Sequence, residues 1–126
     1  MKTAIESKKV PAPIGPYSQA IVANGMVYTS GQIAIDPSTG EYSPSAIEVE
    51  SELVMKNLEA LLEASGSDFS SVVKTSIFLQ SMSDFAEVNA VYSKYMVAPF
   101  PARETVEVAQ LPKSAKVEIS MISIVK

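Results

Sequence analysis

"SPSAIEVESELVMKNLEALLEASG", residues 43–66, has the spacing of a long amphipathic helix. Its apolar side chains recur so as to form one stripe along the helix. They are Ile47, Val54, Leu58, Leu61 and Leu62. Ser45 with Glu48 three residues later has the pattern of a capping box at the start, and Gly66 suits the stop. The apolar stripe must lie against a second layer of the protein.

The segments around this helix predict that layer to be a sheet. Asn24-Gly25 in "IVANGMVYTSGQIAI" (21–35) is typical of a type I′ turn between two strands, and a second turn follows at 36–41. Further strands are expected in 70–80, 104–111 and 115–125, and a second helix in 81–96 with Phe85, Val88, Tyr92 and Tyr95 aligned. Three prolines make 10–20 an extended segment rather than a helix.

This order of elements predicts a single α+β domain over residues 1–126, with two helices on one face of a sheet. Alternation in 115–125 gives one fully apolar face, made of Val117, Ile119 and Met121. The other face begins with polar residues but ends with Ile122 and Ile124. Two apolar side chains on the uncovered face predict that a second copy of the chain packs there, and hence a homo-oligomer.

Composition restricts the chemistry. The 126 residues carry a net charge of −4, which argues against nucleic acid as the main partner. The sequence has no cysteine and no histidine, so disulfides and zinc–thiolate sites are excluded, and so is the commonest general base. Catalysis would have to use carboxylates, hydroxyls, lysine, backbone groups or bound water, and no metal or cofactor site is indicated.

The sequence also bears on location. The first ten residues contain no long apolar run, and no stretch approaches the roughly 20 apolar residues of a membrane span. We therefore expect a soluble, cytoplasmic protein with no membrane partner.

Arg103, the only arginine, lies in "PFPARETVEVAQLP" (99–112). A guanidinium offers a planar fork that binds a carboxylate through two parallel hydrogen bonds. The neighbouring prolines and phenylalanine would exclude water from it. Two other interpretations are open at this stage: a plain surface arginine, or an ion pair with Glu104 or Glu107.

Glu118 is the second candidate, because it lies on a predicted strand between valine and isoleucine. A carboxylate in a partly apolar place can have a raised pKa and act as an acid or base. A solvated edge charge, or a partner for Lys116, is the alternative.

Four further residues are candidates with a structural alternative each. Tyr17 follows the proline-rich segment and could orient a ligand, or simply pack its ring. Ser30-Gly31 lies at the end of a predicted strand. Glycine at this position would allow a ligand to approach the backbone closely, and the alternative is a simple β-bulge. Asn89 lies beside the stripe of the second helix and could bind a ligand or the backbone.

Taken together, six motifs resemble the Rid/YjgF family of reactive-intermediate deaminases. They are "IGPYSQA" (14–20), "TSGQIAIDPSTGE" (29–41), "SVVKTSIFL" (71–79), "DFAEVNAVYSKY" (84–95), "FPAR" (100–103) and "LPKSAKVEI" (111–119). They cover nearly the whole chain in the family's order and spacing. The resemblance implies a chorismate-mutase-like fold with a mixed sheet, and a homotrimeric barrel with a site in each cleft between subunits.

The resemblance also implies an activity without a cofactor: hydrolysis of 2-imino acids such as 2-iminopropanoate and 2-iminobutanoate. These arise through enamines when pyridoxal-phosphate dehydratases act on serine and threonine, and the products are 2-keto acids and ammonia. By this resemblance Arg103 grips the substrate carboxylate, and Glu118 is associated with the attacking water. Further positions in or near the pocket are matched by Tyr17, Ser30, Gly31, Asn89 and Thr105.

The chain departs from the family pattern at two positions. Glu104 stands where a small residue is common, and strand alternation predicts that it points away from Thr105, outside the site. Ser120 stands where a second glutamate is frequent. The alternative to the enzyme is a non-catalytic trimeric module that binds small keto acids, as a metabolite sensor or chaperone-like protein. A ribonuclease fits poorly with the net charge and the lack of histidine.

Overall fold

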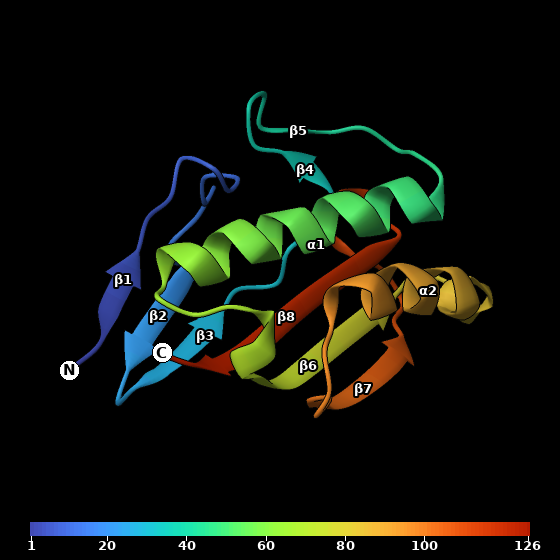
Figure 1. Ribbon diagram of the computed structural model, residues 1–126. Coiled ribbons are helices and arrows are strands. Elements are labelled where there is room, and N and C mark those ends of the chain that lie inside the picture. Colours follow the sequence, from blue (N-terminus) through green and yellow to red (C-terminus); the bar gives the residue numbers. More distant parts are fainter.

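Two helices cover one face of a six-stranded mixed sheet (Figure 1). The computed structural model describes residues 1–126. In spatial order the strands are β1 (Thr3–Ile5), β2 (Ala20–Ala23), β3 (Met26–Thr29), β8 (Val117–Ile124), β6 (Val72–Leu79) and β7 (Ala102–Glu107). The helices are α1 (Ile47–Ala64) and α2 (Phe85–Tyr95). The predicted α+β architecture is confirmed.

The remaining elements are short. Strands β4 (Ile35–Asp36) and β5 (Glu41–Tyr42) form a separate two-stranded ribbon around the predicted second turn. Three 3₁₀ helices complete the chain: η1 (Phe69–Ser71), η2 (Met82–Asp84) and η3 (Pro112–Ser114). Neither α1 nor α2 has the length and apolar character needed to cross a membrane.

The sheet is built around β8, which pairs antiparallel with β3 on one side and β6 on the other. Asn24 and Gly25, with φ of 51° and 76°, form the predicted turn between β2 and β3. Only the β6–β7 pair is parallel, because α2 carries the chain back to the same end of the sheet before β7 begins. The sequence analysis missed β1, whose three residues are too few to show a strand pattern.

The core lies between α1 and the sheet. The predicted stripe on α1 is buried throughout, and so are Val117, Ile119 and Met121 of β8. The opposite face of the sheet has no covering layer within one chain. Tyr28, Val106 and Ile124 are 45%, 41% and 48% exposed there. The apolar character of this face, inferred from β8 alone, thus extends over three strands.

The predicted capping box is wrong. Helix α1 begins at Ile47, and its N-cap is Ala46, which has no side chain able to cap. The Ser45 backbone N–H instead donates to Oε2 of Glu50, one turn inside the helix, at 3.2 Å. Glu50 is buried and also accepts hydrogen bonds from the Tyr42 hydroxyl and the Lys116 backbone N–H. One buried carboxylate therefore joins the helix start, β5 and the segment leading into β8.

The predicted stop at Gly66 is confirmed. Gly66 has φ of +78°, and its N–H donates to the carbonyl of Glu63, while the Ser67 N–H donates to that of Leu62. These two bonds define a Schellman motif, which needs a left-handed residue at this position.

Replacing Gly66 by alanine is expected to lower the free energy of unfolding by about 1 kcal/mol, because the left-handed conformation penalises a Cβ. The nearest atom to the new Cβ would be Cγ1 of Val125 at 3.6 Å, so no clash adds to this cost. Urea denaturation measures the loss. Gly66→Asn is the control and should lose less, since asparagine tolerates this conformation. Equal losses in both variants would contradict the explanation.

Candidate functional site

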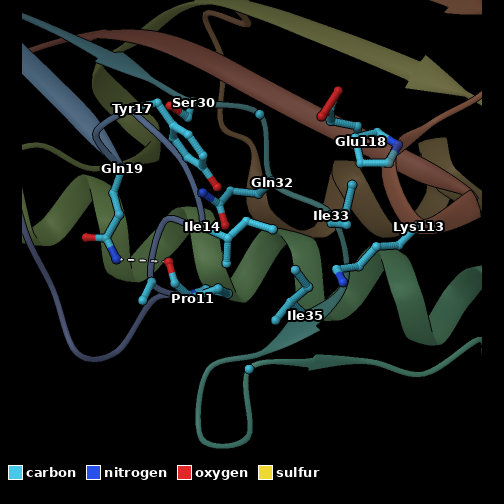
Figure 2. Close-up of a pocket in the computed structure, with 14 residues that line it drawn as sticks. Pro11, Ile14, Tyr17, Gln19, Ser30, Gln32, Ile33, Ile35, Lys113 and Glu118 are labelled. Carbon is cyan, nitrogen blue, oxygen red and sulfur yellow. Dashed lines mark hydrogen bonds between the residues drawn. The ribbon is translucent and has the colours of Figure 1, made fainter.

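A cavity of about 580 Å³ lies beside the start of β8, between the proline-rich segment and the loop that follows β3. Four of the predicted site residues line it together: Tyr17, Ser30, Gly31 and Glu118. They come from three separate parts of the chain, on which Figure 2 labels Tyr17, Ser30 and Glu118. We call this group the carboxylate half-site, after Glu118.

The proline-rich wall of the cavity is tied down by Gln19, which is 4% exposed. Its side-chain amide nitrogen donates to the carbonyls of Ser7, Val10 and Pro11, and its oxygen accepts from the Ser7 N–H at 2.7 Å. The backbone of Gln19 in turn accepts from the Ser30 N–H. The segment that carries Tyr17 is therefore anchored to the loop that carries Gly31.

Glu118 lies directly against the backbone at Gly31. A Cβ at position 31 would come within 2.7 Å of Cδ of Glu118, so only glycine leaves room for the carboxylate in this position. Glu118 forms no ion pair, and Lys116, its predicted alternative partner, instead donates to the carbonyl of Ser45. Burial without a compensating partner raises the pKa of the Glu118 carboxyl above its usual 4.5.

The Ser30 hydroxyl is occupied by a structural contact. It donates to the carbonyl of Ser18 at 2.6 Å, which helps to hold the two cavity segments together. Tyr17, by contrast, is 51% exposed and lines the cavity wall.

Arg103 lies in a second group, which we call the guanidinium half-site. Its Nη1 donates to Oδ1 of Asn89 at 2.8 Å. Its guanidinium carbon lies 5.0 Å from the ring centroid of Tyr92 and 5.8 Å from that of Phe85, within the range of cation–π attraction. Phe100, 69% exposed, lines the same shallow groove of about 180 Å³. The forked cation is thus held in one orientation by an amide and two aromatic rings.

No carboxylate neutralises Arg103 within the chain. Glu104 pairs with Lys74 at 2.8 Å and accepts from the Ser76 hydroxyl, which places it outside the guanidinium half-site, as predicted from alternation. Glu107 accepts instead from the backbone N–H of Met82. The two ion-pair alternatives raised from the sequence are therefore wrong.

The two half-sites lie on opposite faces of the sheet. Arg103 is paired with Thr75, whose buried side chain faces α2 and binds the Tyr92 hydroxyl. Glu118 on β8 is paired with Phe78 on β6. Phe78 lies three residues after Thr75 on that strand, so Phe78 and Glu118 both face the uncovered side of the sheet. A single chain therefore does not bring Arg103 and Glu118 together.

Thr105 and Asn89 belong to the side of Arg103. Thr105 shares its face by alternation, and its buried hydroxyl has no hydrogen-bond partner. The Asn89 side chain accepts a hydrogen bond from the guanidinium, so the alternative in which it bonds to the backbone across the packing layer is wrong.

Sequence reasoning missed the contribution of Phe85 and Tyr92 to this half-site, having assigned both to the apolar stripe. With Asn89 they occupy positions four and then three residues apart along α2, a spacing that places all three on one side of a helix. That spacing was a usable signal. Sequence reasoning also missed Lys113 and Gln19 as residues that line the cavity of the carboxylate half-site.

Comparisons with known proteins agree with this architecture. The family model described as "Endoribonuclease L-PSP" matches residues 7–125. The chain is 48% identical over 122 residues to Reactive Intermediate Deaminase A, chloroplastic, of Arabidopsis thaliana, covering 97% of this chain and 65% of that protein. It is 42% identical to the 2-iminobutanoate/2-iminopropanoate deaminase of Mus musculus, covering 98% and 92%.

A solved structure shows the same fold. The Rid-family protein YyfA from Yersinia pestis superposes with a TM-score of 0.95 at 45% identity, covering 99% of this chain and 100% of that one. The chain belongs to the Rid/YjgF family, the one to which the "Endoribonuclease L-PSP" model corresponds.

Replacing Gly31 by alanine should displace the Glu118 carboxylate while leaving the fold intact, because the clashing atoms are the far end of a flexible side chain. We expect the pKa of Glu118 to fall back toward 4.5 as the carboxylate moves to solvent, measured by carbon NMR of the labelled carboxyl. Gly15→Ala is the matched control, since its Cβ would meet only the Tyr17 ring, at 3.7 Å. An unchanged Glu118 pKa in Gly31→Ala would show that the glycine does not set its position.

Proposed function

We propose that this protein hydrolyses 2-imino acids, such as 2-iminopropanoate and 2-iminobutanoate, to 2-keto acids and ammonia in sites shared between copies of the chain. Relatives named for deamination of reactive intermediates support the reaction class. The observation that carries the proposal is the division of one site over two faces: an unpaired, oriented guanidinium on one and an unpaired carboxylate on the other. A homotrimer that covers the exposed apolar sheet face would bring Arg103 of one copy to Glu118 of the next.

Arg103 binds the substrate carboxylate in this proposal. The fork forms two parallel, charge-assisted hydrogen bonds, and Asn89 with the Tyr92 ring fixes the plane in which it does so. Thr105 lies on the same side of the sheet, and in this proposal it contributes to substrate binding beside Arg103; its hydroxyl is buried in the single chain and has no hydrogen-bond partner there. Binding at a fixed fork orients the imine carbon toward the carboxylate half-site.

Glu118 activates the water. As the water oxygen attacks the carbon of the imine in its protonated, iminium form, Glu118 accepts a proton from the water, and the C=NH2⁺ group becomes the C–NH2 group of a carbinolamine. Glu118 then returns that proton to the nitrogen. The carbon–nitrogen bond breaks to release ammonia, and the hydroxyl group loses its proton to Glu118 as it becomes the carbonyl of the keto acid. An imine is already electrophilic, so a carboxylate with a raised pKa suffices and no histidine is required.

The remaining cavity residues shape the space around the water. The exposed side chain of Tyr17 bounds the cavity, and its hydroxyl can hold the water by a hydrogen bond. Gly31 leaves room for the Glu118 carboxylate close to the backbone, while Ser30 holds the loop in place. In this proposal a second copy supplies Arg103, with Asn89 and Thr105 beside it, to the cavity lined by Glu118, Tyr17, Ser30 and Gly31.

Arg103→Lys should nearly abolish acceleration while leaving the oligomer intact, because an ammonium cannot form the two-pronged contact. The assay generates 2-iminopropanoate from L-alanine with an amino-acid oxidase and follows its loss by semicarbazide trapping. Retention of most activity would contradict the role of Arg103. If the wild type shows no acceleration but binds keto acids, the protein is a sensor rather than an enzyme.

Mixed oligomers test whether the site is shared. Co-expression of Arg103→Lys with Glu118→Gln should restore about a quarter of wild-type activity in a trimer, since each site draws its two residues from different copies. Each variant alone serves as the control. No recovery in the mixture would mean that both residues act within one chain.

The pH profile of kcat/KM should show an acid limb set by Glu118. The carboxyl must be deprotonated to accept a proton, so activity falls as pH drops through its pKa, which burial places above 4.5. Glu118→Gln should remove the limb together with most of the activity, whereas Glu63→Gln, an exposed carboxylate on α1, should leave it unchanged. A limb that persists in Glu118→Gln would assign it to another group.

A further inference from the structure

Lys113 is the one cationic side chain that lines the carboxylate half-site cavity. It lies in η3, just before β8, and forms no ion pair with any carboxylate of the chain. Figure 2 shows its side chain extending along the wall that carries Ile33 and Ile35. An unpaired ammonium beside an apolar wall is a binding group for an anion whose stem is apolar.

The backbone holds Lys113 in an unusual conformation. Lys113 and Ser114 both have φ of 56°, two consecutive left-handed residues that are not glycine. Residues other than glycine rarely adopt this conformation, so the surrounding structure must enforce it at both positions. Two backbone hydrogen bonds close the turn, each 3.0 Å long. The Ser114 N–H donates to the carbonyl of Leu111, and the Ala115 N–H donates to the carbonyl of Pro112. This turn directs the Lys113 side chain to the cavity rather than along β8.

The cavity is larger than the small substrates of the proposed function require. 2-Iminobutanoate has seven non-hydrogen atoms and occupies roughly 200 Å³ if each takes about the share of one water molecule in liquid. The cavity measures about 580 Å³ within a single chain. The single chain therefore offers space for a longer side chain, bordered by Ile33, Ile35 and Lys113.

We propose that Lys113 is a specificity-determining residue that binds the distal carboxylate of dicarboxylic 2-imino acids, such as the imine formed by oxidation of glutamate. The inference rests on the proposed function, because Arg103 of the neighbouring copy binds the first carboxylate and Glu118 serves the imine carbon. The methylene groups of the substrate lie along Ile33 and Ile35. The cation of Lys113 also offsets the repulsion that a second substrate charge would meet from Glu118 in the same cavity.

The reaction is unchanged by this extension. Water adds across the carbon–nitrogen double bond of the dicarboxylic imine, ammonia leaves, and a dicarboxylic keto acid results. Lys113 takes no proton in the step and contributes binding alone, so its loss should raise KM with little change in kcat.

The test compares imines generated in situ from L-glutamate and L-alanine by amino-acid oxidases, with wild type, Lys113→Met and Lys113→Arg. Methionine keeps the unbranched shape and the same backbone cost but removes the charge. We expect Lys113→Met to lower kcat/KM for the glutamate-derived imine about tenfold through KM, with the alanine-derived imine within twofold, and Lys113→Arg to retain most of the preference. Lys2→Met, at an exposed site outside the cavity, is the matched control.

An equal effect of Lys113→Met on both imines, or no effect on either, would overturn the role of Lys113. Binding of the product keto acids by calorimetry separates this outcome from failure of the proposed function. One outcome is that the wild type accelerates neither imine but binds the dicarboxylic keto acid more tightly than the monocarboxylic one, and that Lys113→Met loses this preference. The role of Lys113 in binding the distal carboxylate would then stand, and the deaminase proposal would fall. If the wild type accelerates the alanine-derived imine but shows no such preference, the role of Lys113 falls and the deaminase stands.

Discussion

The two-residue period of β8 connects the core of this protein with its candidate site. Burial of Val117, Ile119 and Met121 under α1 fixes the register of the strand, and that register places Glu118 on the other face. A slip by one residue would expose three apolar side chains and drive Glu118 under the helix without a partner. The hydrophobic term that stabilises the core thus also specifies which way the carboxylate points.

The same alternation explains why a single chain holds only part of a site. Arg103 on β7 faces α2, where the Tyr92 ring and Asn89 orient it, whereas Glu118 faces the uncovered side of the sheet. Each charged group is well placed and neither has a counter-ion of its own. A second copy that packs on the exposed apolar sheet face would bury this surface and would also complete the two half-sites. Assembly and activity would then depend on protein concentration together.

Local patterns predicted much of the fold. The Asn24-Gly25 turn, the apolar stripe of α1 and the stop at Gly66 each depend on backbone preferences that act over a few residues, and all three are confirmed. The capping box failed because Glu50, buried by tertiary contacts, takes over the Ser45 N–H that a local pattern could not assign. Strand β1 was missed because its pairing with β2, rather than its composition, makes it a strand.

The site was predicted less completely, since membership of a site depends on register between strands that are distant in sequence. The residues of the carboxylate half-site could be named from their motifs, but not the fact that Arg103 lies across the sheet from them. That fact follows from the parallel pairing of Thr75 with Arg103, which no local pattern contains. The orientation of Lys113 depends likewise on two left-handed residues whose sequence, unlike that of Gly66, gives no sign of them.

Desolvation governs how such a site can work without histidine. Partial burial in one chain already penalises the ionised form of Glu118 and so raises its pKa. This penalty lowers the stability of the fold at pH values above the pKa of an ordinary glutamate, and it is relieved as the pH falls. A second copy laid over the sheet would remove more water from Glu118, and would at the same time bring Arg103 as a compensating charge. Removal of water also strengthens the hydrogen bonds between the guanidinium and a substrate carboxylate. The interface that hides the apolar face would therefore supply both the proton acceptor and the anion clamp with the low-dielectric surroundings in which they act.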